Sequence, residues 1–292
     1  MRFVEAALER ALDRPHVRVH ESTAISGGSI HEARRLATSE GEFFVKWSVR
    51  CPRDIFFCEA AGLEALRSAN ADIAVPRVIA ATEPSGDEPA FLILEYLEPA
   101  SSDHVPDDET LGRGLAAIHR TRADGFGFDS PSYCGLTRQE NQWRDSWVEF
   151  FRDQRLQPLV DILSRERGMP TADQALYERL MARLPELLPN GASPALIHGD
   201  LWSGNVLFRA GGPALVDPAC AYADREMEFG ITTLFGGMSP RAFGAYEEAW
   251  PLPAGWKERN PLYQLYHLLN HAVLFGGSYA ADARRIAVRY AG

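Results

Sequence analysis

The most restrictive feature of this sequence is a polar segment, His198 to Asn205, that lies between two short apolar runs. Asp200 stands two residues after His198, Asn205 follows five residues later, and Asp217 ends the next apolar run. This spacing is typical of a kinase catalytic loop followed by its metal-binding segment. The pattern therefore predicts a phosphotransferase.

The chemistry of phosphoryl transfer explains why these residue types are needed. One carboxylate must orient the attacking hydroxyl and accept its proton, and we assign this role to Asp200. Asn205 and Asp217 offer the oxygen ligands that Mg²⁺ prefers. We expect His198 to brace the loop by hydrogen bonding rather than to act as a base.

A simpler interpretation treats this segment as a polar turn. The flanking stretches 195–197 and 206–208 are apolar enough for buried strands, and glycine, serine and asparagine suit turns. A turn accounts for the glycines, but it does not require His, Asp, Asn and a second Asp at these offsets. We therefore prefer the catalytic interpretation.

An apolar strand with one lysine precedes the catalytic segment. The stretch 42–47 carries Lys46 among apolar neighbours, at the position of the strand lysine that holds nucleotide phosphates in kinases. Thirteen residues later, Glu59 is the candidate ion-pair partner on a predicted helix over 56–66. Glu64 is its rival, because both lie on that helix.

Two further features would complete a nucleotide site. Gly27 and Gly28 lie where a kinase glycine loop would approach the phosphates, although a Gly-Gly pair is also common in hairpin turns. Glu95, Tyr96 and Leu97 fall where a kinase hinge would bind adenine through its backbone. Together with Lys46, these positions predict ATP as the cofactor.

The hydrophobic pattern changes near residue 98. Strands are predicted over 76–80 and 91–97, and after the polar stretch 98–108 the apolar residues recur at helical spacing. We therefore predict an α+β, two-lobed, protein-kinase-like fold. A small antiparallel-sheet lobe over 1–98 would bind the nucleotide, and a larger, mostly helical lobe over 99–292 would carry the catalytic loop and the substrate pocket.

Two helical patterns occur in the second half of the chain. Aromatic residues recur at helical spacing from Trp143 and Trp147 onward, which predicts a helix over 142–151 with core packing or a substrate-stacking wall as its role. His267 and His271 have the spacing of a helical zinc pair. The zincin pattern needs Glu directly after the first His, and a leucine occupies that place, so a metalloprotease is disfavoured.

Several segments of the chain resemble the fructosamine kinase (ketosamine 3-kinase) family, which is related to the aminoglycoside and choline kinases. They are His198-Gly199-Asp200-Leu201-Trp202-Ser203-Gly204-Asn205, Asp217-Pro218-Ala219, Asp224-Arg225-Glu226, Leu234-Phe235-Gly236-Gly237, the stretch 263–271 and Leu274-Phe275-Gly276. The resemblance extends from about Gly27 to Tyr279. His-Gly-Asp followed by Asn is shared with aminoglycoside and choline kinases, whereas the Trp202 variant with the downstream segments is more specific.

The resemblance implies a function and further site residues. The cofactors would be ATP and Mg²⁺, and the substrate a ketosamine, either small or protein-bound. Phosphorylation at its third hydroxyl gives an unstable product that frees the amine, so the function would be protein or metabolite repair. The resemblance also places Asp224, Arg225 and Glu226 toward the active centre, and it favours Glu59 over Glu64.

Three side chains are candidates for a sugar pocket. Trp202 would offer a ring face, and His267 and Asn270 would offer hydrogen-bonding groups. Trp202 suits packing beneath the loop equally well. A buried polar network is the alternative for His267 and Asn270, which share a helical side with Tyr263.

Two rival functions remain. Asp-Pro-Ala stands where protein kinases have Asp-Phe-Gly, and no Ala-Pro-Glu follows, so a small-molecule kinase is preferred to a protein kinase. The rival of the same class phosphorylates an aminoglycoside, choline or another small alcohol. The rival of a different class is a non-catalytic nucleotide-binding scaffold, against which the joint presence of Lys46, the base and both metal ligands argues.

Composition bears on partners and compartment. The formal charge is −10 and no basic run is present, which argues against nucleic acid as the principal partner. The four cysteines (Cys51, Cys58, Cys134 and Cys220) form no Cys-x-x-Cys pair, so reduced thiols are expected. The N-terminus lacks the apolar core of a signal peptide, and no apolar run is long enough to span a membrane. We expect a cytoplasmic protein without a membrane partner, and the sequence selects no oligomeric state.

Overall fold

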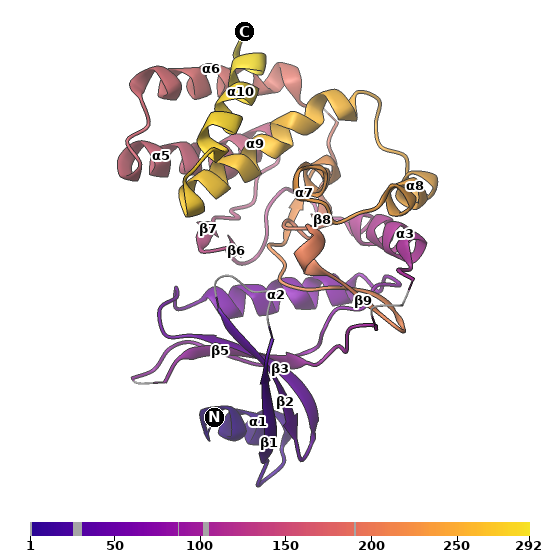
Figure 1. The fold of residues 1–292 in the computed structure, drawn as a ribbon. Coiled ribbons are helices and arrows are strands. Elements are labelled where there is room, and N and C mark those ends of the chain that lie inside the picture. The colour runs from indigo at the N-terminus through magenta and orange to yellow at the C-terminus, as the bar shows by residue number, and fades with distance from the viewer. Residues whose placement is uncertain (1, 26–30, 87, 102–104, 190) are drawn as a thin grey trace.

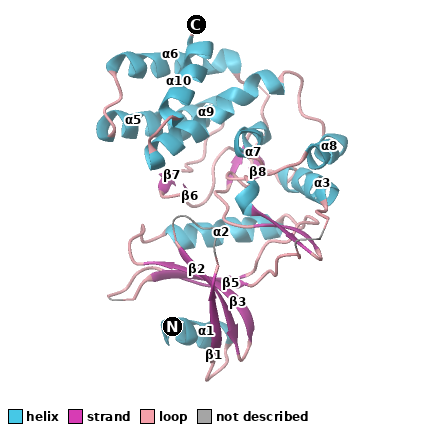
Figure 2. Ribbon diagram, in the orientation of Figure 1, coloured by secondary structure: helices cyan, strands magenta, loops and turns pink. Residues whose placement is uncertain are grey.

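The chain folds into two lobes of α+β structure, as the sequence predicts (Figure 1). The computed structural model describes residues 2–25, 31–86, 88–101, 105–189 and 191–292. Figure 2 shows the main sheet gathered in one lobe and most helices in the other. The N-terminus lies in the small lobe, and the C-terminus lies at the far end of the large lobe.

The small lobe is built on a five-stranded antiparallel sheet with the strand order β1-β2-β3-β5-β4. Its strands are β1 (Val19–Ala24), β2 (Glu32–Thr38), β3 (Gly41–Ser48), β4 (Val78–Thr82) and β5 (Ala90–Glu95). Its helices are α1 (Arg2–Leu12) and α2 (Ile55–Ser68). Because α1 and α2 cover opposite faces, the middle of the sheet is buried on both sides.

Successive side chains along each strand point to opposite faces of the sheet. Phe91 and Ile93 of β5 pack with α1, whereas Leu92 and Leu94 pack with α2. Burial on both faces explains why β5 is apolar throughout rather than alternating. The same alternation in β3 directs Lys46 to the α2 side, where the cavity between the lobes lies.

The large lobe is mostly helical. Its helices are α3 (Asp108–His119), α4 (Trp147–Phe151), α5 (Gln157–Glu166), α6 (Thr171–Leu187), α7 (Glu228–Phe235), α8 (Pro240–Ala249), α9 (Trp256–Phe275) and α10 (Tyr279–Ala291). A π-helical turn, Arg152–Leu156, joins α4 to α5, and 3₁₀ turns span Ser203–Asn205 and Arg225–Met227. Within the described ranges, no helix combines the length and the apolar character needed to cross a lipid bilayer.

Short two-stranded ladders carry the loops of the large lobe. They are β6 (Ser132–Cys134) with β7 (Thr137–Gln139), β8 (Ala195–Ile197) with β11 (Ala221–Ala223), and β9 (Val206–Arg209) with β10 (Gly212–Leu215). The stretches 195–197 and 206–208 thus form the strands that their apolar residues indicate. The catalytic segment lies between them.

Helix α9 runs through the centre of the large lobe and packs against α7, α10 and α5. Its crossing with α7 is close, because a Cβ atom on Gly230 would lie 2.8 Å from the backbone carbonyl carbon of Tyr263. A side chain at position 230 would therefore push the two helices apart. This crossing places His267 and Asn270 beneath the catalytic segment.

The helix predicted over 142–151 begins only at Trp147. Residues before it are held in an extended path, since Gln142 and Gln154 exchange backbone and side-chain hydrogen bonds and Ser146 caps the new helix. Trp143 donates to Asp129 and is 42% exposed. The aromatic spacing across this boundary is therefore not the face of one helix.

Backbone contacts join the lobes beside the catalytic segment. Ala74 of the small lobe bridges Ala214 of β10, with N–H···O bonds of 2.9 Å to Pro213 and from Leu215. Just after the lobe boundary, the amide of Ala100 donates to the Phe208 carbonyl at 2.8 Å, which ties the end of the hinge to β9. These bonds fix the β9–β10 hairpin, and hence Asp217, relative to the sheet.

Candidate active site

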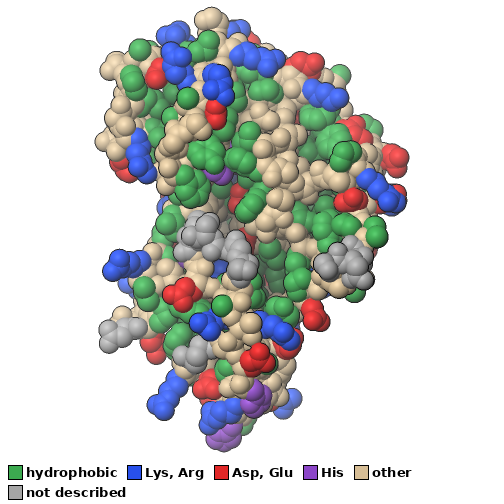
Figure 3. Space-filling model, viewed as in Figure 1, with side chains coloured by type: hydrophobic (Ala, Val, Ile, Leu, Met, Phe, Trp, Pro, Cys, Tyr) green, Lys and Arg blue, Asp and Glu red, His purple; other side chains and the backbone are tan. Residues whose placement is uncertain are grey.

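A cavity of about 820 Å³ lies between the two lobes. Figure 3 shows it as a hollow with hydrophobic side chains gathered on the walls. Its volume falls in the range of sites for small ligands. The predicted site residues on its walls are Lys46, Glu59, Glu95, Tyr96, Leu97, Asp200, Trp202, Asn205, Asp217 and Asn270. Gly27 and Gly28 lie outside the described residues.

Lys46 is held between two carboxylates. Its Nζ lies 2.5 Å from Glu59 Oε2 and 2.9 Å from Asp217 Oδ1, so one ammonium joins β3, α2 and the segment after the catalytic loop. Glu64, the rival partner, is exposed on the outer side of α2. The ion pair predicted for Lys46 is therefore made by Glu59.

The three charges shift one another's pKa. Burial opposes the charge on Lys46, but Asp217 and Glu59 outweigh it and raise its pKa. Burial raises the pKa of Glu59 to about 7, and Asp217 adds to that rise. Burial acts on Asp217 in the same direction, but Lys46 lowers its pKa below the ordinary value. Two carboxylates facing one ammonium leave a negative excess that a cation can neutralise.

The catalytic segment and the Asp217 segment pack at van der Waals contact. Gly199 has φ +81°, and a Cβ there would lie 2.2 Å from the Ala219 carbonyl oxygen. The Ala219 amide donates to the His198 carbonyl at 2.8 Å. Asp217 itself takes the left-handed conformation, with φ 54°, a strain that clusters at functional sites.

His198 braces this arrangement, as expected from the sequence. Its Nε2 donates to the Val216 carbonyl at 2.9 Å, and its Nδ1 accepts from the Asp200 amide at 3.3 Å. Burial lowers its pKa, which keeps the ring neutral and able to play both parts. With both nitrogens engaged, His198 is a structural residue and not a base.

Both carboxylate oxygens of Asp200 accept hydrogen bonds. Asn205 Nδ2 donates to Oδ2 at 3.2 Å, and the Cys134 thiol donates to Oδ1 at 3.6 Å. Burial raises the pKa of Asp200 to about 8. Asn205 uses the same nitrogen toward the carbonyls of Asp200 and Asp217, at 2.8 and 3.4 Å, so its amide oxygen is the atom available to a cation.

Glu228, which the sequence analysis missed, clamps the catalytic loop from below. Its carboxylate accepts the backbone N–H groups of His198 at 2.6 Å and Gly199 at 3.0 Å. It also lies 3.5 Å from Nε2 of His119, whose Nδ1 bonds Tyr246 at 2.9 Å. Burial would raise the pKa of Glu228, but these partners lower it on balance. Only its acidic character at the start of α7 hints at this role.

The structure corrects the placement of Asp224, Arg225 and Glu226, none of which lines the cavity that the described residues enclose. Asp224 accepts from the Tyr263 hydroxyl at 2.8 Å. Glu226 forms a two-pronged ion pair with Arg259, at 2.8 and 2.6 Å.

Arg225, the third of these residues, also points away from the cavity. It donates to the carbonyls of Trp250 and Pro251, at 2.9 and 2.5 Å. Each of the three buried polar groups needs a partner to offset its desolvation, and those partners lie behind the site in α9 and in the segment after α8.

The proposed sugar-pocket residues divide between cavity wall and interior. Asn270 lines the cavity and donates to the Cys134 carbonyl at 3.2 Å. His267 does not line it and is 1% exposed, and burial lowers its pKa to about 3. Trp202 is 37% exposed and packs over Gly204, where a Cβ would lie 2.3 Å from the ring. The Trp202 ring therefore packs against the loop at Gly204 and also forms part of the cavity wall.

Two apolar parts of the wall come from residues to which the sequence analysis gave no site role, although Phe235, His271 and Phe275 lie in segments that carry the family resemblance. The small-lobe end is lined by Ala33, Phe44, Leu94 and Val216. The large-lobe end is lined by an aromatic group, Phe235, His271, Phe275 and Tyr279, with ring centroids 4.6 Å apart for Phe235 and His271. Such residues look like core positions in a sequence, because nothing but the fold shows that they face a cavity.

Comparison with known proteins gives a consistent family assignment. A model of the fructosamine kinase family matches residues 2–290. A "Probable ketoamine kinase" of Vibrio parahaemolyticus is 38% identical over 268 residues, covering 91% of each chain. A protein of the same description from Enterococcus faecium is 35% identical over 264 residues, covering 90% of this chain and 92% of its own.

Solved structures agree. A "Putative fructosamine-3-kinase" from Haemophilus somnus 129PT superposes with a TM-score of 0.87 at 25% identity, covering 98% of this chain and 96% of its own. One from Thermobifida fusca gives 0.83 at 30% identity, covering 99% of both. The aminoglycoside phosphotransferase APH(4)-Ia shares the fold, with a TM-score of 0.62 at 18% identity, covering 99% and 97%. On these matches, the chain belongs to the fructosamine kinase family.

Proposed function

We infer that this ATP-dependent phosphotransferase transfers the γ-phosphoryl group of ATP to the third hydroxyl of a ketosamine. The observation that carries the proposal is that Asp200 lines the same cavity as the Lys46–Asp217 pair, with Asn205 bonded to both aspartates. A base and a phosphate-binding lysine must face the same space for an in-line transfer.

The nucleotide would bind on the small-lobe side of the cavity. We place the boundary between the lobes between residues 98 and 99. Its adenine would enter the slot lined by Ala33, Phe44 and Leu94. The amide of Glu95 is already bonded to the Arg77 carbonyl at 2.9 Å, so the backbone beyond it, at Tyr96 and Leu97, is the expected partner of adenine. Lys46 would hold the phosphates.

A magnesium ion fits the donor set on the large-lobe side. Asn205 offers an amide oxygen and Asp217 a carboxylate, both hard ligands of the kind Mg²⁺ prefers. The negative excess around Lys46 favours a cation at this point. When bound, the ion would neutralise charge on the phosphates.

Asp200 would orient the attacking hydroxyl and accept its proton. Its hydrogen bonds from Asn205 and Cys134 fix both carboxylate oxygens, and Glu228 fixes the backbone that carries it. These contacts hold the carboxylate on the cavity wall, where it can reach a bound hydroxyl.

The large-lobe end of the cavity favours a sugar adduct over an aminoglycoside. An aminoglycoside is a polycation and needs several carboxylates, whereas the acids on the described walls are Glu59, Glu95, Asp200 and Asp217. Two of these pair with Lys46, and Glu95 accepts the Arg77 amide. Aromatic faces such as Trp202 suit the C–H faces of a polyol and the single cationic amine of a ketosamine.

The biological role we propose is repair of glycated amines. Phosphorylation at the third hydroxyl makes the adduct unstable, so that the amine is freed. All four cysteines are unpaired thiols, which fits a reducing cytoplasm as the place of action.

The test is ADP release from Mg-ATP with fructosyl-lysine, ribulosyl-lysine, kanamycin and choline offered in parallel. We expect turnover with a ketosamine, a product phosphorylated at the third hydroxyl, and release of free lysine. Turnover confined to kanamycin or choline would overturn the substrate class. Binding of ATP without turnover on any of the four would favour a non-catalytic scaffold.

A further inference from the structure

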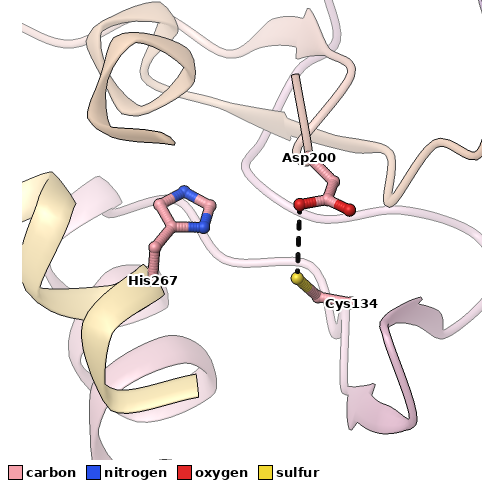
Figure 4. A group of neighbouring side chains, drawn as sticks. All are labelled: Cys134, Asp200 and His267. Atoms are coloured by element: carbon pink, nitrogen blue, oxygen red, sulfur yellow. Dashed lines mark hydrogen bonds between the residues drawn. The ribbon is translucent and has the colours of Figure 1, made fainter. Parts of the chain in front are cut away.

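Cys134, Asp200 and His267 form a compact cluster, in which Cys134 and Asp200 line the cavity and His267 is buried beside them (Figure 4). They come from β6, the catalytic loop and α9, and one ligand atom of each lies within 4.8 Å of those of the other two. The Cys134 thiol donates to the Asp200 carboxylate, whereas phosphoryl transfer gives no role to His267.

The three donors match those of a thiophilic divalent cation. A thiolate, an imidazole and a carboxylate are the common ligands of Zn²⁺, whereas Mg²⁺ prefers oxygen ligands alone. Bond lengths of about 2.3 Å to sulfur and 2.1 Å to oxygen in a tetrahedron separate these two atoms by about 3.6 Å. Cys134 Sγ and Asp200 Oδ1 already lie 3.6 Å apart.

His267 supplies an independent observation that points to a ligand. The residue is 1% exposed, and its Nδ1 is buried without a hydrogen-bond partner. In Figure 4 a ring nitrogen faces Cys134 and Asp200. A buried imidazole nitrogen left unbonded is costly, and a cation between the three side chains would satisfy it.

We propose that Cys134, His267 and Asp200 form a zinc-binding site that inhibits the enzyme by capturing its base. On binding, the Cys134 thiol would release its proton to solvent, and Asp200 Oδ1 would exchange the thiol for the metal. Three protein ligands leave the fourth position to water. Since Asp200 then coordinates the ion, it no longer accepts a proton from the substrate hydroxyl.

The inhibition rests on the proposed role of Asp200, but the metal site does not, so the two are tested separately. Co²⁺ replaces Zn²⁺ as a spectroscopic probe, because a cobalt–thiolate bond absorbs in the near ultraviolet. We expect one Co²⁺ per chain with this band in the wild type and in Cys51→Ser, a control at a partly exposed thiol. Cys134→Ser should lack the band, and Cys134→Ala serves if the serine variant fails to fold.

Zinc affinity and turnover complete the test. Competition with a chromogenic chelator should show at least about a 100-fold loss of Zn²⁺ affinity in Cys134→Ser and in His267→Asn, since a lost ligand costs at least as much as a lost supporting contact. Buffered free Zn²⁺ should inhibit wild-type turnover, and excess Mg²⁺ should not relieve this inhibition. His267→Asn, compared with its own zinc-free rate, should resist it.

Three outcomes would overturn the proposal. They are the absence of the cobalt–thiolate band in the wild type, its persistence in Cys134→Ser, and equal zinc inhibition of the wild type and His267→Asn. A band without inhibition of an otherwise active enzyme would overturn the capture of Asp200. If no ketosamine is phosphorylated, the cobalt spectrum still decides the metal site.

Discussion

The two lobes build their walls of the cavity in different ways. In the described part of the small lobe, Lys46 is the only polar or charged residue among the buried ones, and it stands on a regular strand. The large lobe buries many, among them His119, His198, Glu228 and Asn270. Its catalytic residues lie on loops between strands of three or four residues.

This difference teaches how each lobe positions its chemistry. The sheet of the small lobe is rigid through backbone pairing and apolar packing, so a single side chain on it is already well placed. The catalytic loop has little regular structure and depends on buried hydrogen bonds, above all those of Glu228. Substitutions in the large lobe should therefore affect folding and catalysis together, whereas those in the small lobe should affect nucleotide binding.

The largest loss of stability is expected on removal of the Glu228 carboxylate. Glu228→Ala leaves two buried backbone N–H groups and His119 without their acceptor, which should cost about 3–5 kcal/mol of unfolding free energy. Denaturant unfolding measures this. The matched control, Glu64→Ala on exposed helix surface, should stay within about 0.5 kcal/mol. Equal stability of the two variants would mean that the loop needs no buried clamp.

The small lobe should respond through ATP instead. Lys46→Met removes the phosphate-binding cation, so kcat/KM for ATP should fall by about 10²–10³. Glu59→Gln leaves Lys46 paired with Asp217 and should cost less. Initial rates at varied ATP concentration show which of the two variants loses more kcat/KM. A greater loss in Glu59→Gln than in Lys46→Met would contradict the division of roles between these residues.

Buried histidines should make the large lobe sensitive to acid. The folded pKa of His267 is about 3, below the ordinary value of 6.5, so the unfolded chain binds a proton first as pH falls. Its contribution is present above pH 6.5 and is lost on acidification, up to about 3 kcal/mol by pH 4.

The contribution of His267 is measured by comparing how the unfolding free energy of different variants depends on pH. His267→Asn should flatten the dependence of unfolding free energy on pH, and His20→Asn, at an exposed position of the small lobe, should leave it unchanged. Identical profiles for the wild type and His267→Asn would show that this histidine is not buried as a neutral ring.

The smallest effect concerns glycine packing in the loop. Gly204→Ala would place a methyl group 2.3 Å from the Trp202 ring and should cost about 1–3 kcal/mol. Gly244→Ala, in α8 with no atom within 4 Å of the new Cβ, should stabilise by about 0.5–1 kcal/mol. Thermal unfolding should show a lower melting temperature for Gly204→Ala and a higher one for Gly244→Ala. A neutral Gly204→Ala would show that Trp202 is free to move.

What the sequence could predict follows the same division. Lys46 and the hinge lie on strands with clear periodicity, and the offsets from His198 to Asp217 are local, so the sequence could identify these residues. The choice of Glu59 over Glu64 needed the family resemblance. Glu228 is 30 residues from His198, and its contact depends on the crossing of α7 under the loop. No local pattern carries that information.

The misplaced residues show a limit of the resemblance and of local patterns. The family resemblance placed Asp224, Arg225 and Glu226 toward the active centre, yet the fold turns them toward Tyr263, Trp250 and Arg259. The helix predicted from residue 142 starts late because Gln154 captures the backbone of Gln142. In both cases, tertiary hydrogen bonds that the sequence does not show decide the placement.

The most direct test of the account compares Asp200→Asn with the wild type in Mg-ATP binding and in ADP release with fructosyl-lysine. The account predicts unchanged affinity for Mg-ATP and a turnover lower by about 10²–10⁴, because the variant loses the base and keeps the nucleotide site. Turnover above about a tenth of the wild-type value would contradict the role of Asp200 as the general base.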